Sequence, residues 1–270
     1  MTDTTAPAAA RSISIVQHLS YTVSDTMAVT WRNLITYVRL PQLLVFSSIQ
    51  PVIFVLLFRY VFGGAINVPG GSYVDFLMPG IFVQTAVFGA MGTAIGLAED
   101  LRKGLLERFR SLPMSRAAVL AGRTLAELVR NVWVVALMCA VGFAVGFRVH
   151  TDPWVFISGL GLLLLFGFAL TWIFAFVGLS TGNAETAQAA SFPVMAILVF
   201  ASSAFVPTST MPDWLRIYAD HQPVSITVDA VRALTLGGPT ASKVLYSIAW
   251  SLGILAVAVP LAIWRYRTRV

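Results

Sequence analysis

Apolar residues dominate this chain in long runs that shorter polar segments separate. Each run is about as long as a helix that crosses a bilayer, which takes roughly 20 mostly apolar residues. A helix satisfies its own backbone polar groups, as lipid surroundings require. The runs span residues 42–62, 76–98, 125–147, 154–179, 187–206 and 244–264. The pattern therefore predicts an all-α membrane protein with six transmembrane helices.

A different periodicity precedes the first run. Met27, Trp31 and Val38 recur with Leu34 and Ile35 at helical spacing. Polar residues occupy the opposite side, namely Arg32, Asn33, Thr36 and Arg39, and Pro41 then ends the pattern. This amphipathic segment predicts a helix that lies in the membrane interface. The alternative is a helix folded against other cytosolic segments, because periodicity does not identify what the apolar face touches.

The remaining head of the chain carries no such pattern. Residues 1–20 include a proline- and alanine-rich stretch at 6–10, and we expect them to form a disordered N-terminal tail. Residues 21–270 are expected to form a single transmembrane domain, since the apolar runs are joined by short connections.

Composition agrees with the pattern. Hydrophobic residues make up 57% of the 270 residues and charged residues only 11%, with a mean hydropathy of +0.81. A soluble domain carries about 25% charged residues, so a soluble enzyme is excluded. The single cysteine, Cys139, lies in an apolar run without a partner, which excludes a disulfide framework.

The distribution of basic residues predicts the orientation. Six spans place both termini on one side, together with residues 99–124, and most of the 18 lysines and arginines fall in these segments. Positively charged loops stay in the cytoplasm, so both termini are expected to be cytoplasmic. The net charge of +6 follows from this topology and from anionic lipid, and it does not indicate nucleic-acid binding.

The spans offer little chemistry of their own. Glu127 is nearly the only titratable residue at membrane depth, and a local salt-bridged cluster with Arg123 and Arg130 is favoured over a proton relay. The three histidines are scattered without HExxH spacing, so we expect neither catalytic residues nor a metal site. The chain also lacks the GxxxxGK[ST] pattern of a P-loop, so any ATP-driven work requires another subunit.

Small residues and prolines indicate where the spans pack closely and where they bend. Gly92 and Gly96 have the spacing that lets helices approach closely, as do Gly142 and Gly146. Packing within the chain is favoured over a dimerisation face, because a lone GxxxG is weak evidence. Pro51 and Pro193 are expected to bend the first and fifth spans.

The segment between the second and third spans, residues 99–113, has two faces. Leu101, Leu105, Phe109 and Leu112 fall on one helical face and charged residues on the others, until Pro113 ends the pattern. This predicts a short amphipathic helix that presents an apolar ridge to a cytosolic partner. The alternative, a basic loop held on anionic lipid, explains the charge better than the apolar face.

The segment before the last span, residues 207–241, also shows helical patterning. Pro212 and Pro223 can each open a short helix. Val224, Val228 and Val231 form an apolar side, and the residues opposite are Ser225, Asp229 and Arg232. The pattern predicts two short helices that dip into the outer leaflet, although a cap over the bundle would use the same stripe.

Two motifs carry a resemblance to a known family. One is the run GLLERFRSLPMS at residues 104–115, and the more specific one is FASSAFVP at residues 200–207. The second continues as MPDWL at 211–215, QP at 222–223 and DAVR at 229–232. Over nearly its whole length the chain resembles the membrane subunit of ABC-2 type exporters, in particular the daunorubicin-resistance permease branch.

The resemblance implies a six-span permease with an N-terminal interfacial elbow helix and a cytoplasmic coupling helix. The ATPase-coupling residues it implies are Gly104, Leu105, Glu107, Arg108, Phe109, Leu112 and Pro113. Residues 182–185 are a possible second contact. The outer re-entrant segment it implies contains Pro207, Met211, Pro212, Trp214, Pro223, Asp229 and Arg232.

It also implies the partners and the activity. Two copies of a separate ATP-binding subunit would bind ATP and Mg, and a second permease, identical or a sibling, would complete the complex in a bacterial inner membrane. Such a complex exports an amphipathic drug, lipid, polyketide or glycan, and no motif selects among them. Two alternatives stay open: a membrane-embedded enzyme acting on lipids, although the outer aspartates are scattered, and a passive channel, although no span shows a polar stripe.

Overall fold

The structure, a computed structural model, describes residues 15–63, 72–105 and 116–269. These ranges are helical and contain no strand, in agreement with the expected all-α class. The helices are α1 (Ile15–Arg39), α2 (Pro41–Leu57), α3 (Tyr73–Arg102), α5 (Arg116–Ala144), α6 (Pro153–Ser180), α7 (Ala184–Phe200), α8 (Asp213–His221), α9 (Pro223–Leu236) and α10 (Ala241–Arg269). A π-helical turn η1 (Phe58–Phe62) continues α2, and a 3₁₀ turn η2 (Thr208–Thr210) precedes α8.

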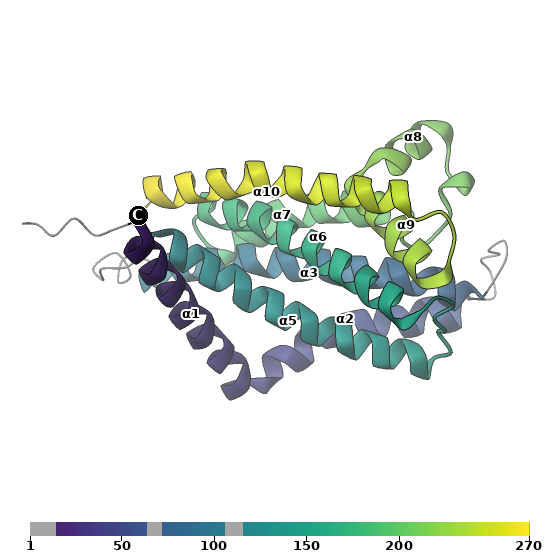
Figure 1. The fold of residues 1–270 in the computed structure, drawn as a ribbon, viewed down its shortest axis with the longest axis horizontal. Helices are drawn as coiled ribbons and strands as arrows, with labels where there is room; N and C mark the ends of the chain where they lie inside the picture. Colours follow the sequence, from purple (N-terminus) through teal and green to yellow (C-terminus); the bar gives the residue numbers. More distant parts are fainter. Residues whose placement is uncertain (1–14, 64–71, 106–115, 270) are drawn as a thin grey trace, which may run out of the picture.

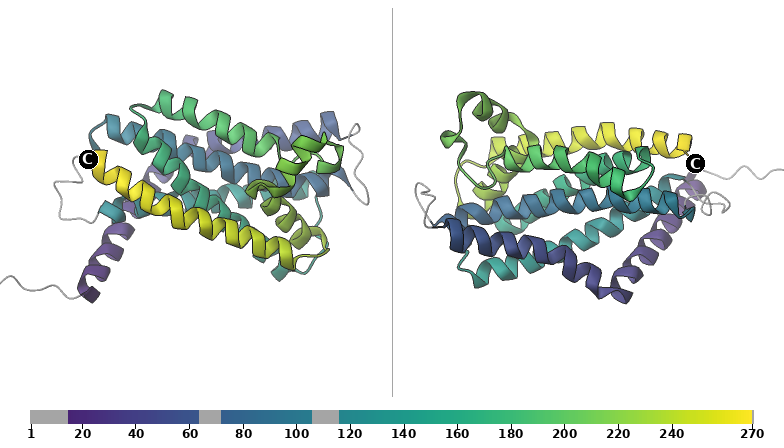
Figure 2. Two further views of the ribbon diagram at one scale, coloured as in Figure 1. Left: turned by 90° about the horizontal axis from the view of Figure 1, so that it is seen from above. Right: turned by 180° about the vertical axis from the view of Figure 1, so that it is seen from behind.

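The long helices lie side by side along one axis (Figure 1). Helix α3 is central and contacts α2, α5, α6, α7 and α9. The start of α1 and the end of α10 lie at one end of the bundle, which we call the terminal end, while α8 and α9 lie at the other, the α9 end (Figures 1 and 2). The fold therefore separates the two segments that the sequence singled out.

Five of the described helices are long and apolar enough to cross a membrane: α2 with η1, α3, α5, α6 and α10. The expected fifth span, residues 187–206, is instead the 17-residue helix α7, which ends at Phe200. Ala201 leaves the helical region at φ −93° and ψ 39°. Beyond it the Ser202 hydroxyl donates to the carbonyl of Val199 and accepts from the amide of Ala204. Serine hydroxyls that bind nearby backbone compete with helix continuation, which explains the early end.

Glycines allow helix backbones to touch in the core. A Cβ at Gly80 would lie 2.0 Å from the carbonyl oxygen of Ala204, and one at Gly178 would lie 2.4 Å from that of Ala94. The central helix therefore packs directly against α6 and against the segment that follows α7. Gly96, one of the glycines at GxxxG spacing, leaves room for the guanidinium of Arg123. This glycine therefore serves packing within the chain.

We expect Gly80→Ala to destabilise the protein by about 1–3 kcal/mol, because the added methyl group must displace backbone in a filled core. The measurement is the thermal unfolding midpoint of the purified protein in detergent. Gly92→Ala is the matched control, because Gly92 lies on the same helix and a Cβ added there meets nothing within 4 Å. Equal midpoints for the two variants would contradict the packing described here.

Helix α1 meets α2 at a corner formed by Leu40 and Pro41, and it slants away from the bundle axis (Figure 1). Its buried residues Val29 and Thr30 pack on α5 near Gly122. Trp31 is 66% exposed and Val38 is 79% exposed. Much of the apolar face expected from the sequence thus points away from the rest of the described protein.

Candidate functional site

The coupling segment begins at the terminal end of the bundle. Helix α3 ends at Arg102, and Gly104 follows in a left-handed turn with φ 66° that favours glycine. Gly104 and Leu105 are the last residues described before α5. The other coupling residues expected from the sequence, Glu107, Arg108, Phe109, Leu112 and Pro113, lie outside the described residues. Their role stays a prediction.

One ion pair connects the two helices that flank this segment. The guanidinium of Arg123 on α5 pairs with the carboxylate of Asp100 on α3. One turn further along α3, Lys103 pairs with Glu99 at 2.9 Å on the surface. The ends of α3 and α5 are therefore held together where the coupling segment leaves and re-enters the bundle.

A buried polar cluster joins α1 to α5. Glu127 accepts hydrogen bonds from the hydroxyl of Tyr37 at 2.9 Å and from Nε of Arg130 at 2.6 Å. The Glu127 side chain is only 9% exposed. Burial and the charge of Glu127 raise the pKa of the Tyr37 phenol, which keeps it a donor. The expected pairing with Arg130 is confirmed, whereas Arg123 pairs with Asp100 on another helix, which local spacing could not indicate.

At the α9 end, two short helices occur as the prolines predict. Pro212 directly precedes α8 and Pro223 is the first residue of α9. The valine side of α9, at Val224, Val228 and Val231, is fully buried. Since α9 packs on α3, α6 and α10, the stripe is part of the bundle core.

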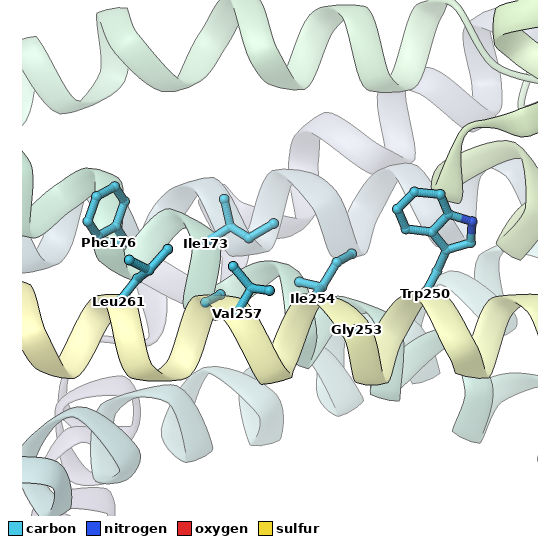
Figure 3. A pocket seen from close by; sticks show the side chains of 8 residues that line it. Ile173, Phe176, Trp250, Gly253, Ile254, Val257 and Leu261 are labelled. Carbon is cyan, nitrogen blue, oxygen red and sulfur yellow. The ribbon is translucent and has the colours of Figure 1, made fainter.

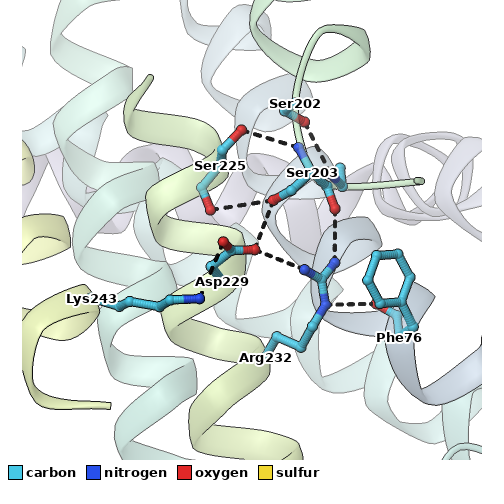
Figure 4. Close-up of polar contacts among 8 residues, drawn as sticks. Phe76, Ser202, Ser203, Ser225, Asp229, Arg232 and Lys243 are labelled. Carbon is cyan, nitrogen blue, oxygen red and sulfur yellow. Dashed lines mark hydrogen bonds and ion pairs between the residues drawn. The ribbon is translucent and has the colours of Figure 1, made fainter. Parts of the chain in front are cut away.

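Arg232 is the centre of a polar network that joins α9 to distant segments (Figure 4). Its guanidinium donates to Oδ1 of Asp229 at 2.8 Å, to the carbonyl of Ser203 at 2.8 Å and to the carbonyl of Phe76 at 3.2 Å. The guanidinium carbon also lies 3.8 Å from the centre of the Phe76 ring, a cation–π contact. Burial lowers the pKa of Arg232 to about 10, so the side chain keeps its charge at neutral pH.

Asp229 extends the network to α10 and to the segment after α7. Its Oδ1 accepts from the hydroxyl of Ser203 at 2.9 Å, and its Oδ2 pairs with Lys243 at 3.4 Å. The amide of Ser203 donates to the hydroxyl of Ser225 on α9 at 3.1 Å. One carboxylate thus connects three segments of the chain.

The irregular segment at residues 201–207 depends on these side chains. Nε2 of Gln222 donates to the carbonyl of Leu198 at 3.0 Å and to that of Ala201 at 2.7 Å. The Tyr73 hydroxyl donates to the carbonyl of Phe205, whose ring stacks on Phe58 at 4.5 Å. Non-helical backbone at membrane depth requires such partners, because lipid supplies none.

The structure brings together some of the expected outer residues and leaves others apart. Asp229 and Arg232 lie in the network, and Pro223 opens the helix that carries them. Pro207, Met211, Pro212 and Trp214 belong to the connection around α8, and Trp214 is 73% exposed. Sequence patterns assigned no role to five of the network residues: Tyr73, Phe76, Ser203, Gln222 and Lys243. Two of them lie in the motifs that carry the family resemblance, Ser203 in FASSAFVP and Gln222 in QP.

These features define a multi-pass integral membrane protein whose helices are joined by polar contacts, among them the Asp100–Arg123 pair between α3 and α5 and the Tyr37–Glu127 hydrogen bond between α1 and α5. The particular family follows from comparison with known proteins: a family model described as ABC-2 type transporter matches residues 24–236. The chain belongs to the ABC-2 transporter permease family. The match runs from within α1 to the last residue of α9, so it includes the Glu127 cluster and the Arg232 network apart from Lys243.

Two similar proteins are named as drug-resistance permeases, and a third is named as a transport permease. The daunorubicin resistance ABC transporter permease protein DrrB1 of Streptomyces coeruleorubidus is 34% identical over 247 residues, which cover 92% of this chain and 87% of that protein. The probable doxorubicin resistance ABC transporter permease protein DrrC of Mycobacterium tuberculosis is 30% identical over 243 residues, 89% of this chain and 88% of that protein. A putative transport permease, ycf38, of Cyanophora paradoxa is 26% identical over 216 residues, 78% of this chain and 74% of that protein.

Proposed function

We propose that this chain is the transmembrane permease subunit of an ABC exporter. It moves an amphipathic compound out of the cytoplasm or the inner leaflet, using ATP hydrolysed by a separate subunit. The observation that carries the proposal is the family match over residues 24–236, together with relatives over most of the chain that are named as drug-resistance permeases. Among the amphipathic classes, the names of these relatives favour a drug.

In this proposal the terminal end of the bundle faces the cytoplasm and the motor. Two ATP-binding subunits bind ATP and Mg there, and a second permease completes the complex in a bacterial plasma membrane. The positive-inside distribution of arginines supports this orientation. The exposed apolar residues of α1, such as Trp31 and Val38, support its placement as an elbow helix in the interface of the same leaflet.

In this proposal, polar contacts between helices transmit a displacement of the coupling segment through the bundle. A motor that displaces the coupling segment pulls on the ends of α3 and α5, which Asp100 and Arg123 join. The Glu127 cluster then transmits the displacement of α5 to α1. At the α9 end, the Arg232 network holds the irregular segment after α7, whose rearrangement would open the outward path. A ligand or nucleotide shifts such an equilibrium only by its differential contacts with the two states.

Transport is tested with inside-out vesicles that contain the chain and its ATP-binding subunit, supplied with a panel of anthracyclines and fluorescent amphipathic lipids. We expect ATP-dependent accumulation of at least one of them, which disappears when the ATPase active site is inactivated. Accumulation that needs the chain but is independent of nucleotide and of the ATPase subunit would overturn the proposal in favour of a channel.

We expect Glu107→Ala with Arg108→Ala to weaken the affinity for the ATP-binding subunit about tenfold, because truncating a central interface residue costs more than about 1 kcal/mol. The measurement is titration of the ATPase subunit onto the purified permease. Arg267→Gln is the control, an exposed charge at the same end of the bundle. Unchanged affinity in the double variant would remove these residues from the interface while leaving the family assignment intact.

A further inference from the structure

An apolar groove runs between α6 and α10 (Figure 3), and its lining residues Trp250, Val257 and Leu261 are exposed. Its volume is about 300 Å³. The residues that line it include Ile173 and Phe176 on α6 and Trp250, Gly253, Val257 and Leu261 on α10. Gly253 borders open space, since a Cβ added there meets nothing within 4 Å.

The groove has the length of one leaflet. From Trp250 to Leu261 the helix rises about 17 Å, at 1.5 Å per residue. The hydrocarbon core of a bilayer is about 30 Å thick, so one leaflet contributes about half of that length. The groove runs along α10, one of the helices long and apolar enough to cross a membrane, so an acyl chain bound in it would lie along that helix.

The groove is cationic at the end that lies toward the C-terminus of α10. Arg265 follows Leu261 by one helical turn, and Arg269 follows by one more. Nη2 of Arg269 donates to the carbonyl of Ser180 at 2.9 Å, which places both arginines beside the end of α6. Nε of Arg265 and the hydroxyl of Ser180 are both buried and have no hydrogen-bond partner in the described residues.

These two arginines differ from the paired cations of the bundle. Within residues 15–63, 72–105 and 116–269, no carboxylate forms an ion pair with Arg265 or Arg269. By contrast, Arg123, Arg130 and Arg232 each have an acidic partner. A guanidinium in this position presents a planar fork of donors that matches a phosphate.

We propose that the α6–α10 groove binds an anionic phospholipid, with one acyl chain along Gly253 and the phosphate at Arg265 beside Ser180. Charge complementarity at the groove end selects this occupant over a neutral lipid. A second copy of the chain is disfavoured, because a two-fold contact around the membrane normal brings the same arginines to the same level, where they repel. The site lies on the outside of the bundle and goes beyond the proposed export function.

The test uses the purified full-length chain in mild detergent, titrated with phosphatidylglycerol or phosphatidylcholine and followed by native mass spectrometry. We expect phosphatidylglycerol to bind about tenfold more tightly than phosphatidylcholine, and Arg265→Gln to remove that preference. Arg267→Gln is the matched control, since its position is displaced around the helix from Arg265. Equal binding of the two lipids, or an equal effect of the two arginine variants, would overturn the site.

A second variant tests the groove itself. Gly253→Phe fills the groove without displacing backbone. We therefore expect this variant to purify without bound phospholipid, while its thermal unfolding midpoint stays that of the wild type. Gly161→Phe adds the same bulk at another open glycine, on α6 outside the groove, and is expected to keep the lipid. Retention of phospholipid by Gly253→Phe would overturn the proposal. A dimer in the wild type that Gly253→Phe dissociates would also overturn it, in favour of a second copy.

Discussion

Glu127→Ala is expected to destabilise the protein by about 3–5 kcal/mol, the loss that follows when one partner of a buried ion pair is removed. The Arg130 side chain, only 10% exposed, would keep its charge without a carboxylate, and the Tyr37 hydroxyl would lose its acceptor. The measurement is the thermal or denaturant-induced unfolding of the purified protein in detergent. The same variant should loosen α1, which hydrogen exchange of residues 22–39 would report.

Two controls separate the buried cluster from surface charge. Tyr37→Phe removes one hydrogen bond and is expected to cost about 1 kcal/mol. Glu99→Ala breaks the exposed pair with Lys103, and an exposed pair contributes about 0–1 kcal/mol. If Glu127→Ala were no more destabilising than Glu99→Ala, the α1–α5 cluster would not hold α1 as described.

Arg232→Met is expected to cost about 2–4 kcal/mol, because it leaves two carbonyls without their donor, at about 1–3 kcal/mol for each. Asp229 is 32% exposed and keeps its pair with Lys243, so the loss of its ion pair adds less. Those carbonyls belong to Ser203 and Phe76. The loss should concentrate on the irregular segment, so amide exchange of residues 201–207 is expected to rise before that of α3. Hydrogen exchange followed by mass spectrometry measures this directly.

Arg216→Met is the matched control for this substitution. Arg216 lies on α8 at the same end of the bundle, but its side chain is half exposed and its nearest carboxylate, on Asp220, is 4.0 Å away. We expect no change in stability beyond about 0.5 kcal/mol, as for surface substitutions in general. Equal exchange of residues 201–207 in the two variants would show that Arg232 does not hold the segment.

The sequence predicted the spans where apolar content alone decides them. The helices α3, α6 and α10 contain their expected runs and extend beyond them into polar turns, because a helix that ends outside the apolar layer still gains its hydrogen bonds. Helix α5 begins earlier than its expected run, at Arg116, and ends before it, at Ala144. The end of α7 was not predictable in this way. Besides the local hydrogen bonds of Ser202, it depends on Gln222, whose side chain binds the carbonyls of Leu198 and Ala201 from 24 and 21 residues away.

At the candidate sites, too, the sequence predicted the local contacts and not the long-range ones. The sequence placed Asp229 and Arg232 on one face of a short helix, and the i, i+3 pair is present. Their other partners, Phe76 and Ser203, lie 156 and 29 residues from Arg232, and no local pattern indicates such contacts. Likewise, spacing suggested that Glu127 pairs with Arg123, but Asp100 on the neighbouring helix is closer to that arginine.

The claim that this chain works as the membrane subunit of an ATP-driven exporter is tested most directly by its partners. The measurement is purification of the tagged chain from native membranes in mild detergent, with mass spectrometry of the co-purifying proteins and an assay of ATP hydrolysis. The account predicts a P-loop ATPase in amounts comparable to the permease, with an activity that depends on the permease. A chain that purifies without any nucleotide-binding partner, and shows no ATP hydrolysis in membranes or in detergent, would contradict it.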